Sequence, residues 1–224
     1  MALILNIDTA TTIGSVCLAR DSQPLQTMVN EKQQDHAAAI TLFVKEILAR
    51  QQITPGQLDA IAVSAGPGSY TGLRVGVATA KGLCYAWGKP LLAISTLQMM
   101  AQGKRSELQD DTAYYCPMLD ARRQEVYTAI YDYAGHDVKP PEALILTPDA
   151  YHTWLEEKKV YFFGDGSMKW EQLSAPHPHA LFVPYHISAE HMISLSEAAF
   201  AQQHFADVAY FSPFYLKPFY FPAK

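Results

Sequence analysis

Apolar residues in the first half of the chain follow two spacings: short runs typical of buried strands, and longer stripes that repeat with the period of a helix. The runs predict strands over Leu3–Asp8, Ser15–Arg20, Leu25–Val29, Ala60–Ala65 and Leu91–Ile94. The stripes predict helices over His36–Gln51, Ser69–Trp87 and Ser95–Gln102. The order along the chain is therefore three strands, a helix, a strand, a helix, a strand and a helix.

The second half repeats this order in a shorter form. Its predicted strands are Ala113–Asp120, Glu125–Asp132, Ala143–Leu146, Val160–Phe163 and Leu181–Val183. Its predicted helices are Thr147–Glu157, Met168–Leu173 and Ala189–Phe205. Asp8 and Asp120 end the first strands of the two halves, and Gly66-Pro67-Gly68 matches Gly164-Asp165-Gly166 in position. We expect an α/β protein of two duplicated ribonuclease-H-like domains, residues 1–103 and 104–224, of which the second is abbreviated.

The chain closes on a stretch that cannot be the interior of a helix. Residues 209–224 hold seven aromatic residues and three prolines, and proline breaks a helix because it lacks the backbone donor. We expect this tail to cross the surface and to fill an apolar groove.

Composition limits the classes of function. The formal net charge is −5 and only 17% of residues are charged, so no general attraction to nucleic acid is expected and any nucleic acid would be contacted mainly through another subunit. Cys17, Cys84 and Cys116 lie far apart without the spacing of a zinc site, which is typical of reduced thiols. No run has the length of a membrane span and the N-terminus lacks a basic leader. We therefore expect a cytoplasmic protein away from the membrane.

One sharp turn joins a predicted buried strand to a predicted helix. Gly66 and Gly68 allow a tight turn and close approach, and Ser69 can cap the helix. The free N–H groups of such a turn often bind phosphate or another anion, but the same turn forms wherever a helix leaves a strand. Both interpretations remain open. The turn matches a dinucleotide fingerprint poorly, because no acidic residue follows at the required distance.

A second candidate site lies in the turns after the first strand and before the short helix of the second half. The stretch Asp8-Thr9-Ala10-Thr11-Thr12 is placed like the phosphate-binding hairpins of sugar kinases, Hsp70 and actin. The candidate degenerate nucleotide site comprises Asp8, Thr9, Thr11, Gly164, Asp165 and Gly166. These residues can equally close a hairpin and a strand exit. The eight histidines lack the spacing of a metal pair on one helix face, so no metal and no cofactor are expected.

Two predicted helices are apolar over more of their surface than one sheet can cover. A helix that is apolar on nearly all sides is buried on nearly all sides. We expect these helices to form a partner interface, through Ile40, Phe43, Val44, Ile47, Leu73, Gly76, Val77, Ala80 and Cys84. The alternative is that the second domain of the same chain buries them.

These features together resemble the bacterial TsaB family, also called the YeaZ family. The matching segments are NIDTATTIGSVCL, DAIAVSAGPGSYTGLRVGVATAKGL, KPLLAISTLQMMA, LDARRQEVYTAIY and SPFYLK. The resemblance implies the two-domain fold of sugar kinases, Hsp70 and actin. It also implies a part in making N6-threonylcarbamoyladenosine beside the anticodon, in tRNAs that read codons beginning with A.

The resemblance further implies partners and the absence of a catalytic site. In the family the related transferase TsaD modifies the tRNA, TsaB supports TsaD in a heterodimer, and TsaE, an ATPase, completes a ternary complex. TsaB forms a homodimer when alone. TsaD carries a metal-binding His-x-x-x-His on the helix that matches Ser95–Gln102, and no histidine occurs there in this chain. We expect a non-catalytic partner subunit. The alternative is an autonomous nucleotide-dependent phosphotransferase or metallopeptidase-like hydrolase.

Overall fold

A computed structural model describes residues 2–31 and 36–217 of the 224-residue chain. The first half builds a five-stranded sheet in the spatial order β3-β2-β1-β4-β5. Its strands are β1 (Leu3–Asp8), β2 (Gly14–Arg20), β3 (Gln23–Asn30), β4 (Ala60–Gly66) and β5 (Leu91–Ser95). The first three strands pair antiparallel, whereas β4 and β5 join parallel to β1.

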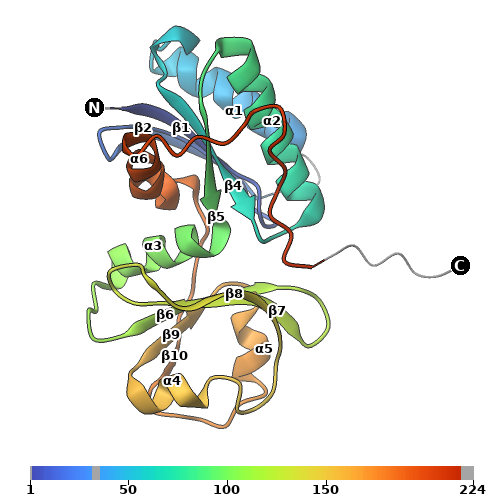
Figure 1. The fold of residues 1–224 in the computed structure, drawn as a ribbon, viewed down its shortest axis with the longest axis vertical. Helices are drawn as coiled ribbons and strands as arrows, with labels where there is room; N and C mark the ends of the chain where they lie inside the picture. The colour runs from blue at the N-terminus through green and yellow to red at the C-terminus, as the bar shows by residue number, and fades with distance from the viewer. Residues whose placement is uncertain (1, 32–35, 218–224) are drawn as a thin grey trace, which may run out of the picture.

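The second half builds the same sheet again (Figure 1). Its strands are β6 (Tyr114–Asp120), β7 (Glu125–Tyr131), β8 (Asp137–Ile145), β9 (Val160–Phe163) and β10 (Ala180–Phe182). The order β10-β9-β6-β7-β8 is the first order read from the other end, with the same strand directions. The predicted fold class, a duplicated α/β architecture, is confirmed.

Apolar residues on both faces of β1 and β4 explain why helices cover both sides of the first sheet. On one face, α1 (His36–Arg50) and α2 (Tyr70–Trp87) pack over residues such as Leu5 and Val63. On the other face, alternating residues such as Ile4 and Ala62 meet α3 (Thr96–Leu108), η3 (Ala189–Met192) and α6 (Ile193–Ala201). The period-2 alternation of side chains divides these contacts between the two faces.

The helix α3 lies between the two sheets and belongs to the core of both (Figure 1). Leu97 and Met100 share one hydrophobic cluster with Ile94 of β5 and with Tyr115 and Tyr131 of the second sheet. After β10, the chain returns to the first sheet, where the Ser196 hydroxyl donates to the Asn6 side chain at 2.7 Å. The domain boundary between residues 103 and 104 falls inside α3 and stays a prediction.

Four predicted elements differ from the structure. The helix predicted over Ser95–Gln102 continues to Leu108 as α3. The short strand predicted at 143–146 is the end of the longer β8, because an edge strand tolerates Pro140 and Pro141. The helix predicted from Thr147 forms only as α4 (His152–Glu157), after a stretch of turns. The last predicted helix begins as the 3-10 turn η3 and ends at Ala201, since Gln203 is left-handed with φ 56°. The remaining short elements are η2 (Pro55–Gln57) and α5 (Ser167–Glu171).

The aromatic tail crosses the surface beside α2, as predicted for the described part of it. Phe211 of the tail, with Ala206 and Val208 just before it, packs against the cluster between α2 and the first sheet. Lys81 on α2 donates to two tail carbonyl oxygens, those of Ala209 at 3.2 Å and Phe211 at 2.8 Å. The predicted remainder, 218–224, lies outside the described residues. No described helix combines the length and the apolar character that crossing a membrane requires.

Candidate functional site

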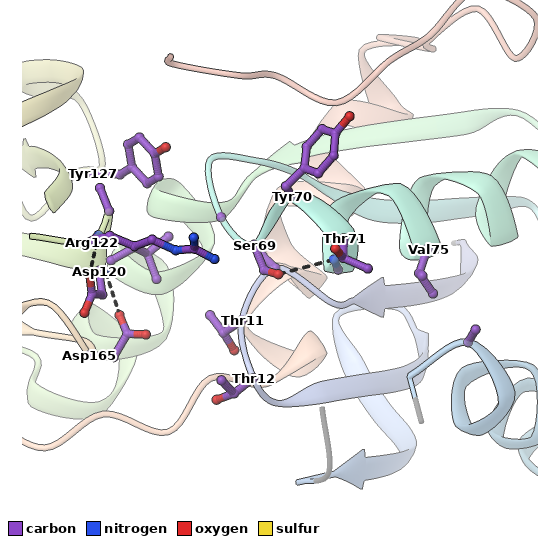
Figure 2. Close-up of a pocket in the computed structure, with 16 residues that line it drawn as sticks. Thr11, Thr12, Ser69, Tyr70, Thr71, Val75, Asp120, Arg122, Tyr127 and Asp165 are labelled. Carbon is purple, nitrogen blue, oxygen red and sulfur yellow. Dashed lines mark hydrogen bonds between the residues drawn. The ribbon is translucent and has the colours of Figure 1, made fainter. Parts of the chain in front are cut away.

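A cleft of about 900 Å³ lies between the two halves of the chain, and residues of both halves line it (Figure 2). The first half contributes the β1–β2 hairpin and the beginning of α2. The second half contributes the β6–β7 hairpin, Tyr127 and the turn at Asp165. The labelled side chains of Figure 2 come from both walls and surround one space. The duplicated fold therefore places corresponding hairpins on opposite sides of one cleft.

The first wall is formed by a hairpin seated on the start of a helix. Ser69 caps α2 as predicted, because its hydroxyl accepts from the backbone N–H of Gly72 at 3.3 Å. The Ser69 N–H in turn donates to the Ala10 carbonyl oxygen at 2.7 Å. A Cβ at Gly72 would overlap the Thr9 carbonyl oxygen, and one at Gly68 would overlap that of Ala10. Packing of the hairpin on α2 thus explains these glycines, and the hydroxyls of Thr11, Thr12 and Thr71 line the cleft.

The second wall is a strained hairpin held by one lysine. Arg122 and Arg123 have φ of 67° and 52°. This is the left-handed region of the backbone, which residues other than Gly, Asn and Asp rarely adopt. Lys169 supports the hairpin by donating to the Asp120 carboxylate at 2.6 Å and to the Arg123 and Glu125 carbonyl oxygens at 2.6 and 3.2 Å. The same Asp120 oxygen accepts from the Arg122 N–H at 2.5 Å. The Arg122 side chain extends from this hairpin toward Ser69 (Figure 2).

Asp165 joins its turn to the hairpin of the second wall. Its carboxylate accepts from the Asp120 N–H at 2.9 Å. Surrounding atoms displace water from this carboxylate, which raises its pKa above the usual value, and the nearby Asp120 charge acts in the same direction. Hydrogen bonding and the ammonium of Lys169 oppose the rise.

The structure brings together half of the predicted nucleotide-site residues. Thr11 and Asp165 line the cleft, and Gly164 joins them in an adjoining pocket of about 80 Å³. The other three lie away from the cleft surface, in the core of their turns. Asp8 and Thr9 are fully buried, and they bond to the Ala10 N–H and the Gly72 carbonyl oxygen respectively. Gly166 is buried, and its N–H donates to the Met118 carbonyl oxygen.

Sequence reasoning missed Arg122, Tyr70 and Tyr127 as cleft residues. A signal was present, because Asp120 occupies in the second half the position of Asp8 in the first. The hairpin that follows Asp120 is therefore the counterpart of the one that follows Asp8. Which side chain of that hairpin extends into the cleft depends on its left-handed backbone, which the sequence pattern does not reveal.

The side chains predicted to contact a partner need correction. Seven of them are at most 4% exposed, namely Ile40, Val44, Ile47, Leu73, Val77, Ala80 and Cys84. Gly76 is also buried and Phe43 is half-buried. All of them except Leu73 and Gly76 belong to one hydrophobic cluster between α1, α2 and the first sheet of the same chain. Neither expected burial pattern holds, because the covering layer is the chain's own first sheet rather than a partner or the second domain.

The remaining chemical groups form no metal site in the part of the chain that the structure describes. No group of three or more His, Cys, Asp or Glu side chains converges there. The three cysteines are free and buried. Burial raises the thiol pKa to about 11 for Cys17 and about 12 for both Cys84 and Cys116.

Comparison with known proteins identifies the family. A family model described as TsaD, tRNA N6-adenosine threonylcarbamoyltransferase, matches residues 28–213. A tRNA threonylcarbamoyladenosine biosynthesis protein TsaB from Bacillus subtilis is 30% identical over 178 residues, which cover 76% of this chain and 74% of the relative.

Solved structures agree with this relationship. YeaZ from Pseudomonas aeruginosa superposes with a TM-score of 0.79 at 26% identity, covering 96% of this chain and all of that one. An inorganic polyphosphate/ATP-glucomannokinase from Arthrobacter shares the fold, with a TM-score of 0.50 at 14% identity over 91% of this chain and all of that one. The chain therefore belongs to the TsaB (YeaZ) family, within the wider group that the TsaD model describes.

Proposed function

We propose that this chain acts in the biosynthesis of N6-threonylcarbamoyladenosine in tRNA, as a non-catalytic subunit that binds a TsaD transferase. Its TsaB relative carries the name of that pathway, and the matching family model describes the transferase itself. The modified nucleoside would be the adenosine 3′ of the anticodon in tRNAs that read codons beginning with A. The net charge of −5 favours indirect contact with tRNA, through the complex, in the cytoplasm.

The observation that carries the partner role is the outer face of α1 and α2. Their inner faces pack on the first sheet, whereas Leu42 on α1 is 52% exposed and Tyr85 on α2 is 87% exposed. Both helices cover the face of the first sheet opposite α6 (Figure 1), and only their first two turns line the cleft to the second half. Exposed Ala78 and Gly82 on α2 would allow another helix to approach closely. We call the residues Ala38, Leu42, Ala78, Gly82 and Tyr85 the outer helix face.

A charge on the outer helix face tests the partner role. Tyr85→Asp should reduce co-purification with TsaD at least tenfold and should abolish tRNA modification in a reconstituted mixture, because it buries a carboxylate in the interface. Ile145→Asp is the matched control, since Ile145 is also exposed, at 69%, but lies on β8 of the second sheet. Unchanged complex formation by Tyr85→Asp would contradict the proposal.

We further propose that the outer helix face serves self-association when TsaD is absent, and that TsaE joins the complex of this chain with TsaD. Sedimentation should then show a dimer of this chain that TsaD converts into a heterodimer. Tyr85→Asp should shift the isolated chain to a monomer. A dimer that persists in the presence of excess TsaD would count against a shared surface.

An autonomous nucleotide-dependent enzyme is the less favoured function. Mg²⁺-nucleotide chemistry at the first hairpin requires a carboxylate within reach of the cleft, whereas Asp8 is fully buried beneath its hairpin. Calorimetry with ATP and Mg²⁺ on the isolated chain decides the matter. Micromolar binding that disappears in Asp8→Asn would restore the enzymatic alternative.

A further inference from the structure

We propose that the cleft binds a small phosphate ester without a metal ion, and that the Arg122 guanidinium holds the phosphate. The site is independent of the outer helix face and does not depend on the subunit role proposed above. Its residues are Arg122 from the second half and Thr11, Thr12 and Thr71 from the first.

The size and shape of the cleft fit a small organic ligand. At about 900 Å³ it lies in the range of small-molecule sites and is far larger than an inorganic anion requires. Its walls carry several hydroxyl groups together with the aromatic residues Tyr70 and Tyr127. A ligand that joins an anionic group to an organic group could bind the hydroxyls with the first and pack on the aromatic rings with the second.

The charges of the cleft make Arg122 its available cation. Asp120 is neutralised by Lys169 at 2.6 Å, and Asp165 bonds to the backbone N–H of Asp120. Among the described residues, the guanidinium of Arg122 makes no hydrogen bond or ion pair, and only the backbone N–H of Arg122 is bonded, to Asp120. An arginine fork matches phosphate oxygens in a bidentate arrangement. An anion that enters the cleft would therefore meet a guanidinium that no carboxylate pairs directly, while the Asp165 carboxylate on the same wall keeps its hydrogen bond to the Asp120 N–H.

The donors around Arg122 favour phosphate over a metal–phosphate complex. Thr12 and Thr71 can donate to a phosphate oxygen from the wall that Arg122 faces, whereas the Thr11 hydroxyl donates to the Ile13 carbonyl oxygen at 3.3 Å. The cleft carboxylates of Asp120 and Asp165 already accept from backbone N–H groups and Lys169. A Mg²⁺ ion would compete with these bonds for its oxygen ligands.

The hairpin is built to hold Arg122 in one place. A left-handed residue costs free energy and persists only where its surroundings determine it. Here the three bonds of Lys169 and the bond from Arg122 N–H to Asp120 provide that support. Binding a ligand would therefore cost the rotamer freedom of the Arg122 side chain but no rearrangement of the backbone that carries it.

Calorimetry on the full chain in EDTA, with AMP, ribose 5-phosphate and inorganic phosphate as probes, tests the site. AMP should bind with a dissociation constant below about 1 mM, and Arg122→Gln should weaken this binding at least tenfold, the loss expected for a charge-assisted pair. Arg122→Lys should lose less, because it keeps the charge but not the fork. Arg123→Gln is the matched control, since it shares the hairpin and its left-handed backbone but does not line the cleft.

Each result decides for or against the site. Tighter binding of AMP than of ribose 5-phosphate supports a role for the aromatic wall, and equal binding of the two supports phosphate recognition alone. Absence of AMP binding, equal binding by Arg122→Gln, or binding that requires Mg²⁺ would overturn the proposal. Co-purification of Arg122→Gln with TsaD should stay unchanged, which separates this site from the subunit role. Thermal unfolding of the variants confirms that they are folded.

Discussion

At the scale of the residue, Gly72 and Gly82 on α2 lie in opposite surroundings, one crowded and one open. Gly72 lies against the Thr9 carbonyl oxygen, where any Cβ would overlap, whereas nothing lies within 4 Å of a Cβ at Gly82. Gly72→Ala should therefore lower the free energy of unfolding by about 1–3 kcal/mol, because the backbone must move. Gly82→Ala should raise it by up to about 1 kcal/mol through helix propensity. Urea denaturation measures both, and equal effects would contradict the packing described.

The buried thiols give a second prediction at this scale. At pH 8, Cys17, Cys84 and Cys116 should react with a thiol reagent only when the chain unfolds, because burial keeps their pKa at about 11 to 12. The native state retains these protons to higher pH than the unfolded chain does. Stability should therefore fall as the pH rises above about 9, the ordinary thiol pKa. Rapid labelling of the folded protein at pH 8 would refute this.

Individual residues were the hardest part of the molecule to predict from sequence. The cap at Ser69 followed from local chemistry, because a hydroxyl before a helix has few alternatives. The burial of Asp8 and the position of Arg122 did not follow, since the first depends on tertiary packing and the second on a left-handed turn.

At the scale of the element, α2 shows why the sequence of an apolar helix does not reveal what each of its faces packs against. The sequence predicted its bounds closely, because Ser69 and Gly88 mark its ends. It did not predict which face meets the first sheet, because small residues cover both sides of the helix. Val77 and Ala80 face the sheet, while Ala78 and Gly82 face outward.

The two faces of α2 should respond differently to the same charge. Val77→Asp should cost at least about 3 kcal/mol of unfolding free energy, because it places an uncompensated carboxylate in the core. Ala78→Asp on the outer face should cost only about 0.5 kcal/mol. Chemical denaturation with circular dichroism measures the difference. Loss of partner binding in Val77→Asp would report unfolding, which is why Tyr85→Asp is the informative variant.

At the scale of the whole molecule, repeated strand order predicted the duplicated fold, because hairpins and crossovers allow few topologies. The return of the chain to the first sheet was not predicted. η3 and α6 carry no pattern that assigns them to one sheet, and only the structure shows the Ser196–Asn6 and Ala189–Ser15 hydrogen bonds. The helices η3 and α6, which follow the second sheet in sequence, therefore complete the core of the first sheet.

The two sheets should unfold together, because α3 and α6 connect their cores. Trp87 reports on the first sheet, and Trp154 and Trp170 report on the second. In Trp87→Phe the remaining fluorescence reports on the second sheet alone, whereas circular dichroism reports on the whole chain. For this variant the two signals should give urea transitions with the same midpoint and the same steepness. Two separated transitions would show that the halves are independent.

The position of α3 has a practical consequence for protein engineering. The exposed turn at Asp111 and Thr112 follows α3 and precedes β6, so a cut there would leave two pieces. The N-terminal piece would keep α3 but lack η3 and α6. The C-terminal piece would carry η3 and α6 without the first sheet that they cover. Each piece would thus offer the surface that the other requires, which makes this loop a site for splitting the protein into reporter fragments that reassemble when brought together.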